Sequence, residues 1–142
     1  MAELREWTLS RGIEPPVVFV GEMLHHHDGI GQTSLWQSLT SGGRWHAVSI
    51  FRTREGRFVV YLTFRSRVKG ELDNREVFWS DQANGLSAVF ARYQQVAFPV
   101  IAQRMQGSPE KCQRDAVDLL ARYQRQVEAA LAAVPAAVVK IS

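Results

Sequence analysis

The stretch RWHAVSIFRTREGRFVVYLTFRSR, residues 44–67, decides the fold, because apolar and polar residues alternate on both sides of Glu55-Gly56. Alternation with a period of two is the pattern of a β-strand that has one face on a hydrophobic core. Two such runs separated by two residues that include a glycine are typical of a hairpin. The stretch therefore predicts an antiparallel pair of strands with a tight turn at residues 55–56.

The predicted turn also determines which side chains share a face. A two-residue turn at 55–56 pairs residue 54 with residue 57 and residue 46 with residue 65. The face expected on the core then holds Trp45, Ala47, Phe51, Phe58, Val60, Leu62 and Phe64. The opposite face holds His46, Val48, Ile50, Arg52, Arg54, Arg57, Val59, Tyr61, Thr63, Arg65 and, one step beyond, Arg67.

The rest of the chain predicts an α+β fold. PPVVFVGEMLHH (15–26) and REVFW (75–79) have the composition of further strands, and from residue 81 onward apolar residues recur at helical spacing. The sequence Gly107-Ser108-Pro109-Glu110 ends one helix and starts another, while Pro99 is expected to bend or divide the first. We therefore expect an antiparallel meander of about four or five strands, followed by two C-terminal helices packed on one face.

We expect a single domain spanning residues 1–142, which is strand-rich over 1–79 and helix-rich over 81–134, with a short C-terminal tail at 135–142. The loop that contains GIGQTSLWQSLTSGG is expected to include one helical turn at 34–39. The tail run AVVKI, 137–141, is predicted to add an edge strand or to cross to a partner.

Composition points to an ordinary globular protein. Hydrophobic residues make up 46% of the 142 residues and charged residues 22%, and no apolar run is long enough to cross a bilayer. The acidic start lacks the pattern of a signal peptide, so a cytoplasmic location without membrane contact is expected. Cys112 is the only cysteine, which excludes an internal disulfide.

Positive charge is concentrated in the predicted sheet, since residues 44–79 carry eight basic and four acidic side chains. Arginines beside aromatic rings suit a nucleic-acid backbone, because cations pair with phosphates and rings stack on bases. The candidate binding residues for nucleic acid or another partner are Arg52, Arg54, Arg57, Tyr61, Arg65 and Arg67. The favoured function is a small non-catalytic binding protein, with DNA and RNA left undistinguished.

The alternative function is a protein-interaction or assembly subunit whose arginines meet an acidic protein partner. Four tryptophans in a chain of this size, together with the alanine-rich segment EAALAAVPAAVV (128–139), are compatible with a homodimer. The same arginines are also typical of a sheet face that only contacts solvent, because arginine and threonine are ordinary residues on such a face.

A third hypothesis is a metal-dependent hydrolase centred on His25, His27 and Asp28. If a strand runs through this cluster, His25 and His27 point to the same face. A second acidic group, Glu71, Asp73 and Glu76, has the residue types of a magnesium site, but ion pairing with Lys69 and Arg75 is the favoured interpretation. No nucleophile motif or dinucleotide-binding loop occurs, so the sequence favours a protein without catalytic residues, metal or cofactor.

Overall fold

The fold is an antiparallel sheet followed by two helices, and the computed structural model describes it for residues 4–29 and 41–134. The five strands lie in chain order across one sheet, each antiparallel to the next. Their bounds are β1 Arg5–Arg11, β2 Glu14–Asp28, β3 Arg44–Thr53, β4 Phe58–Ser66 and β5 Asn74–Ser80. A short 3-10 turn, Ala83–Gly85, leads into α1 Leu86–Arg104 and α2 Pro109–Ala132. The predicted α+β meander with two C-terminal helices is confirmed.

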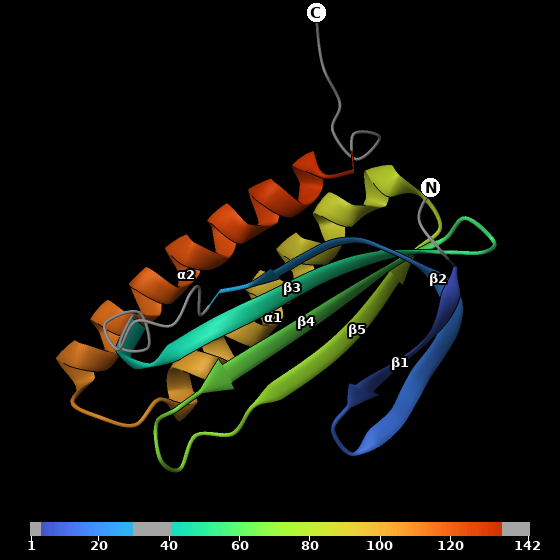
Figure 1. The fold of residues 1–142 in the computed structure, drawn as a ribbon. Helices are drawn as coiled ribbons and strands as arrows, with labels where there is room; N and C mark the ends of the chain where they lie inside the picture. Colours follow the sequence, from blue (N-terminus) through green and yellow to red (C-terminus); the bar gives the residue numbers. More distant parts are fainter. Residues whose placement is uncertain (1–3, 30–40, 135–142) are drawn as a thin grey trace, which may run out of the picture.

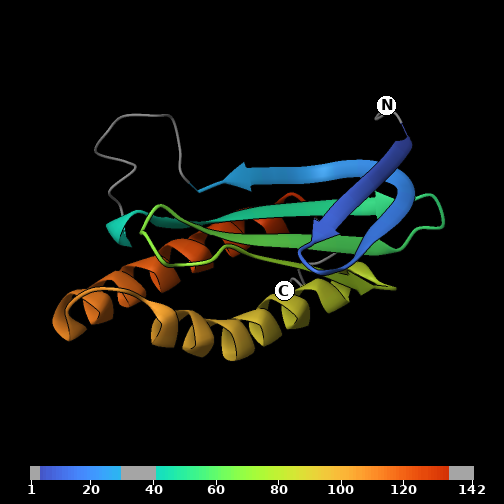
Figure 2. The same cartoon turned by 90° about the horizontal axis from the view of Figure 1, so that it is seen from below.

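The sheet is curled, and its two faces are covered differently. Both helices lie on one face (Figure 1), and the β1–β2 hairpin curls over part of the other face, as the view from below in Figure 2 shows. The hairpin is held there by the Tyr61 hydroxyl on β4, which donates a 2.8 Å hydrogen bond to the carbonyl of Ser10 on β1. The result is a half-barrel in which neither α1 nor α2 covers the remaining part of the second face.

The pairing of β3 with β4 differs by one residue from the prediction. Ile50 pairs with Val60, not with residue 61, and Val48 pairs with Leu62, not with residue 63. The loop contains three residues, 54–56, because the Thr53 N–H donates a 2.7 Å hydrogen bond to the Arg57 carbonyl. Three-residue hairpin loops of this kind end in a left-handed residue, and the φ of Gly56 is 84°. The turn was located correctly, but its predicted length was wrong.

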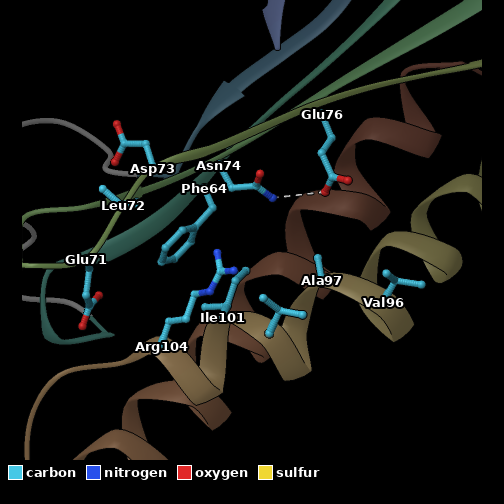
Figure 3. Close-up of a pocket in the computed structure, with 11 residues that line it drawn as sticks. Phe64, Glu71, Leu72, Asp73, Asn74, Glu76, Val96, Ala97, Ile101 and Arg104 are labelled. Atoms are coloured by element: carbon cyan, nitrogen blue, oxygen red, sulfur yellow. Dashed lines mark hydrogen bonds between the residues drawn. The ribbon is translucent and has the colours of Figure 1, made fainter. Parts of the chain in front are cut away.

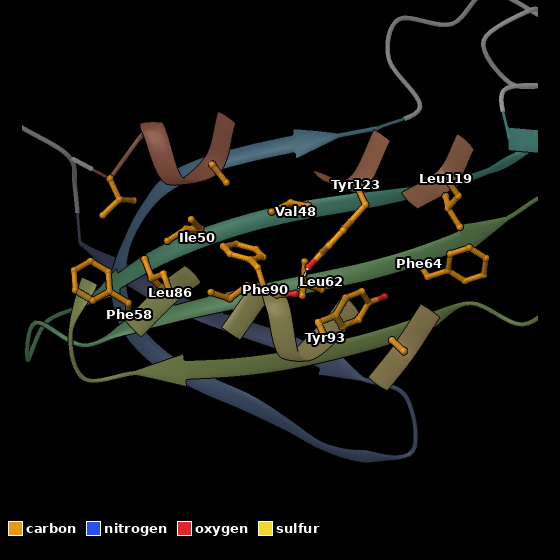
Figure 4. Close-up of a cluster of buried hydrophobic side chains, with 14 of the residues drawn as sticks. Val48, Ile50, Phe58, Leu62, Phe64, Leu86, Phe90, Tyr93, Leu119 and Tyr123 are labelled. Atoms are coloured by element: carbon orange, nitrogen blue, oxygen red, sulfur yellow. Dashed lines mark hydrogen bonds between the residues drawn. The ribbon is translucent and has the colours of Figure 1, made fainter. Parts of the chain in front are cut away.

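One residue of register exchanges the faces of β3 relative to β4. The helix-covered core therefore takes even-numbered residues from both strands (Figure 4). The prediction for β4 was correct, but for β3 it was inverted, since His46, Val48 and Ile50 are buried in this core. The helices complete it with Leu86, Phe90, Tyr93, Ala97, Ile101, Leu119, Tyr123 and Ala130.

A second, smaller cluster forms beneath the β1–β2 hairpin. Phe51 and Val59, which pair across β3 and β4, are buried there with Leu9 and Val77. Trp7, Val17, Phe19 and Tyr61 pack around them. Phe51 thus belongs to this cluster and not to the helix-covered core where the predicted register placed it. Near the β3–β4 turn the central strands are therefore apolar on both faces. This explains why the adjacent residues Val59 and Val60 of β4, which point to opposite faces, are both apolar.

The helix boundary was predicted correctly. The Ser108 side chain caps α2 by accepting a hydrogen bond from the Lys111 N–H at 3.4 Å, and Pro109 occupies the first helical position. The first helix runs through Pro99 without being divided. Over the described residues, neither helix combines the length and the hydropathy that a membrane-spanning helix needs.

A buried arginine joins the end of the sheet to the helix connection. Arg44, the first residue of β3, is 2% exposed and binds Glu71 through two hydrogen bonds, of 2.7 Å from Nε and 2.6 Å from Nη2. It also contacts Asp115 on α2 at 3.0 Å and donates to the carbonyl of Gln106 between the helices at 3.1 Å. Glu71 accepts a further hydrogen bond from the Gln106 N–H at 2.7 Å. Three regions that are distant in sequence, namely the start of β3, the β4–β5 connection and the region around the start of α2, therefore meet at one guanidinium.

Two predictions lie outside the described residues. These are the helical turn at 34–39 and the edge strand or partner crossing at 137–141.

Candidate functional site

The six residues predicted to form a binding surface do not share one. Arg52, Arg54 and Arg57 lie at or beside the β3–β4 turn, whereas Arg65 and Arg67 lie at or just beyond the opposite end of β4. Eight residues of extended strand separate positions 57 and 65, which amounts to about 27 Å. The predicted surface is therefore divided between two ends of the sheet.

The arginines near the turn are largely engaged in ion pairs. Arg52 pairs with Glu22 on β2, and its Nε lies 3.0 Å from Oε1 of that carboxylate. The Nε of Arg57 lies 2.6 Å from Oδ1 of Asp81. Arg54 occupies the turn itself and is exposed. Because Arg52 has the parity of Ile50, it also does not belong to the face that carries Arg65.

Tyr61 lies between the two ends but is not available for stacking on a base. Its hydroxyl is occupied by the Ser10 carbonyl, and its ring packs at the edge of the cluster beneath β1. The curl of the β1–β2 hairpin therefore removes the one aromatic side chain of the predicted set.

A different group gathers at the helix-free end of the second face. Trp45 on β3 pairs directly with Arg65 on β4, and the guanidinium carbon of Arg67 lies 5.6 Å from the centroid of the Trp45 ring. Arg75 on β5 pairs with Thr63, so it lies on the same face, one strand further across the sheet. We call Trp45, Arg65, Arg67 and Arg75 the basic platform.

The charge of the basic platform is only partly neutralised. Arg65 is 3.7 Å from Asp73, a long contact between two side chains that are each about two-fifths exposed. Arg67 and Arg75 make no ion pair within the described parts of the chain. Trp45 is half-buried beneath Arg67, so its ring is held in place while the guanidinium remains exposed. An aromatic ring, the exposed Arg65 and Arg67 and the half-buried Arg75 are thus combined on one surface.

Sequence reasoning found Arg65 and Arg67 but missed Trp45 and Arg75. The wrong register assigned Trp45 to the core, and Arg75 was expected only as a partner for turn carboxylates. No local signal in the sequence locates Trp45, because its face depends on the loop length: with Gly56 as the third residue of the loop, the parity of β3 is inverted.

The histidine cluster is divided by the sheet. His25 pairs with Ile50 and His27 with Val48, so these two share the helix-side face as expected, whereas Asp28 pairs with Ala47 on the other face. Nδ1 of His27 accepts a 3.0 Å hydrogen bond from the Gln126 side chain. In residues 4–29 and 41–134, no group of three or more His, Cys, Asp or Glu side chains has the arrangement of a metal site.

The turn carboxylates are also committed elsewhere. Burial opposes the ionisation of Glu71, but the hydrogen bonds from Arg44, Gln106 and Ser66 outweigh it and lower the pKa of this carboxyl. Asp73 accepts a 3.2 Å hydrogen bond from the Ser66 N–H. The partners of these acids are thus Arg44 and Arg65, not the Lys69 and Arg75 that were expected.

His46, expected beside the arginines, is enclosed in the core. Its Nε2 is 2.8 Å from the Tyr93 hydroxyl, and it lies among the rings of Phe64, Tyr93, Phe98 and Tyr123. Burial lowers the pKa of His46 to about 3, so the ring is neutral at pH 7. This histidine therefore contributes no charge to a binding surface.

Comparison with protein families, with characterised proteins and with solved structures found no match to this chain.

Proposed function

We propose that this protein is a small non-catalytic binding protein whose basic platform holds single-stranded nucleic acid. The observation that carries the proposal is the placement of Trp45 among Arg65, Arg67 and Arg75 on the sheet face opposite α1 and α2. Arginines pair with phosphates, and an aromatic ring offers a stacking surface to any base.

The shape of the surface favours a single strand over a duplex. The platform is a patch of sheet, and the described chain presents neither helix from this face for insertion into a major groove. Trp45, Arg65 and Arg75 come from three neighbouring strands, so an extended strand that lies across β3, β4 and β5 would reach all three side chains. An acidic protein segment carries similar negative charge but has no bases that could stack on Trp45. A comparison of Trp45→Phe with Trp45→Leu therefore distinguishes nucleic acid from an acidic protein partner.

The test measures fluorescence anisotropy of labelled single-stranded DNA, single-stranded RNA and duplex DNA at several salt concentrations. We expect the single strands to bind more tightly, with affinity that falls steeply as salt increases. The Arg65→Ala/Arg67→Ala variant should show weaker binding and a salt dependence that is shallower by about 1.4 in log–log slope, about 0.7 for each phosphate that is no longer neutralised.

The matched control is Arg54→Ala/Arg57→Ala, which removes the same charge from the other end of the hairpin. This variant should retain most of the affinity if binding occurs at the platform. Trp45→Phe, which keeps a ring, should bind better than Trp45→Leu, which does not. Equal losses in both arginine variants would point to general charge attraction, and no binding at low salt would overturn the proposal.

A further inference from the structure

A hollow on the helix side of the sheet lies apart from the basic platform. It occupies about 260 Å³ between α1 and the strand end formed by β5 and the connection before it (Figure 3). Its volume is slightly below the ~300–1,000 Å³ of typical ligand pockets, so it suits a small ligand. Phe64, Ala97 and Ile101, all buried, form its apolar floor.

Large apolar side chains around this hollow are left in solvent. Leu72 is 79% exposed, Val96 58% and Val100 41%, and all three line the same hollow. Single exposed apolar residues are normal on protein surfaces, but several that converge on one concave site indicate contact with an apolar ligand.

One carboxylate in the hollow lacks a cationic partner. Glu76 on β5 is half-buried, and burial raises the pKa of its carboxyl. Its hydrogen bond within the described chain comes from the Asn74 side chain at 3.2 Å, drawn as a dashed line in Figure 3, and no described cation lies within ion-pair distance. A carboxylate that has lost part of its hydration gains more from a cation than an exposed one does.

None of the other charged side chains that line the hollow forms an ion pair with Glu76 within the described chain. Glu71 is already bound to Arg44, and Asp73 lies near Arg65. Arg104 lines the hollow from α1 but makes no ion pair within the described chain and is exposed to water. Although both side chains line the hollow, the Arg104 guanidinium forms no ion pair with the Glu76 carboxylate within the described chain.

We propose that this hollow is a binding site for a small organic amine, with its ammonium group on the Glu76 carboxylate and its apolar chain over Ala97, Ile101 and Phe64. The ammonium supplies the charge-assisted hydrogen bonds that Glu76 lacks. The apolar chain covers Val96 and Val100 and removes them from water. This site does not depend on the nucleic-acid proposal.

The test is an NMR titration of the ¹⁵N-labelled protein with hexylamine, hexan-1-ol and heptanoate, which carry different head groups on the same hexyl chain. Hexylamine, charged at pH 7, should cause saturable shifts concentrated in residues 74–78 and 96–104. Hexan-1-ol should bind about tenfold more weakly or worse because it carries no positive charge, and heptanoate more weakly still because its negative charge repels the carboxylate.

Two variants locate the ammonium site. Glu76→Gln keeps the shape of the side chain and should reduce the affinity for hexylamine about tenfold while leaving that for hexan-1-ol unchanged. Val96→Lys, at a position exposed enough to preserve the fold, supplies an internal ammonium and should also block hexylamine. Glu110→Gln, in the first turn of α2 and outside the hollow, is the matched control.

Three results would overturn the proposal. The first is equal binding of hexan-1-ol and hexylamine, which would mean that only apolar contact matters. The second is an undiminished affinity of Glu76→Gln for hexylamine. The third is the absence of saturable shifts, or shifts scattered over the molecule.

Discussion

The sharpest stability prediction concerns the buried guanidinium of Arg44. The side chains of Arg44 and Glu71 are 1% and 4% exposed, and they share two hydrogen bonds, of 2.7 and 2.6 Å. Replacing Arg44 by methionine keeps much of the volume but leaves the Glu71 carboxylate buried without its cation. Breaking a buried pair in this way costs about 3–5 kcal/mol, a large share of the roughly 5–15 kcal/mol that stabilises a typical domain.

The assay is urea unfolding of native protein and Arg44→Met, followed by circular dichroism at pH 7. With a slope of about 2 kcal/mol per molar urea, the expected loss lowers the midpoint by about 1.5–2.5 M. The exposed pair of Arg57 and Asp81 provides the control, because Arg57→Met should cost at most about 1 kcal/mol.

A double variant tests the mechanism. Arg44→Met/Glu71→Leu removes both charges, so it should be clearly more stable than the sum of the two single losses implies. The Lys111 ammonium, 2.8 Å from Asp115, still neutralises the remaining acid of the network. A loss below about 1 kcal/mol for Arg44→Met, or strictly additive losses, would refute the view that an uncompensated buried charge is the cause.

Two further predictions concern pH and the hairpin loop. The pKa of His46 falls from its ordinary value of 6.5 to about 3 on folding. Below pH 6.5 the His46 ring is therefore protonated in the unfolded chain but stays neutral in the folded protein. Stability should therefore fall by about 2 kcal/mol between about pH 7.5 and pH 5.0, and His46→Gln should flatten this slope; an unchanged slope would assign it to other groups, such as His25, whose pKa is also lowered. Gly56→Ala should cost about 1 kcal/mol in urea unfolding because the φ of 84° disfavours alanine, although the added methyl meets no atom within 4 Å. Gly56→Asn should lose less, and equal losses would contradict this conformational explanation.

Local patterns predicted the elements well. The Gly107-Ser108-Pro109-Glu110 boundary was correct because a helix cap depends on residues within four positions of one another. The alternation in 58–64 identified the core face of β4 correctly, since each strand position alternates whatever its partner does. These features need no knowledge of distant contacts.

The candidate site was predicted only in part, and the failure has a definite origin. A two-residue and a three-residue loop differ by one residue, yet that difference transfers Trp45 from the core to the platform and His46 from the platform to the core. The sequence of the loop is compatible with both lengths, and the choice between them depends on which face of β3 the helices bury.

The sequence by itself determined that strands precede helices, where the helix boundary lies and that arginine is in excess in the sheet, because these depend on neighbouring residues or on composition; β1, Arg5–Arg11, was not among the predicted strands. Only the tertiary structure decided which arginines share a surface, that Tyr61 lies beneath β1, that Arg44 is buried, and that Glu76 lines a hollow together with α1. Each of these depends on contacts between segments far apart in the chain, whose relative placement is determined by how the curled sheet and the helices bury apolar area together.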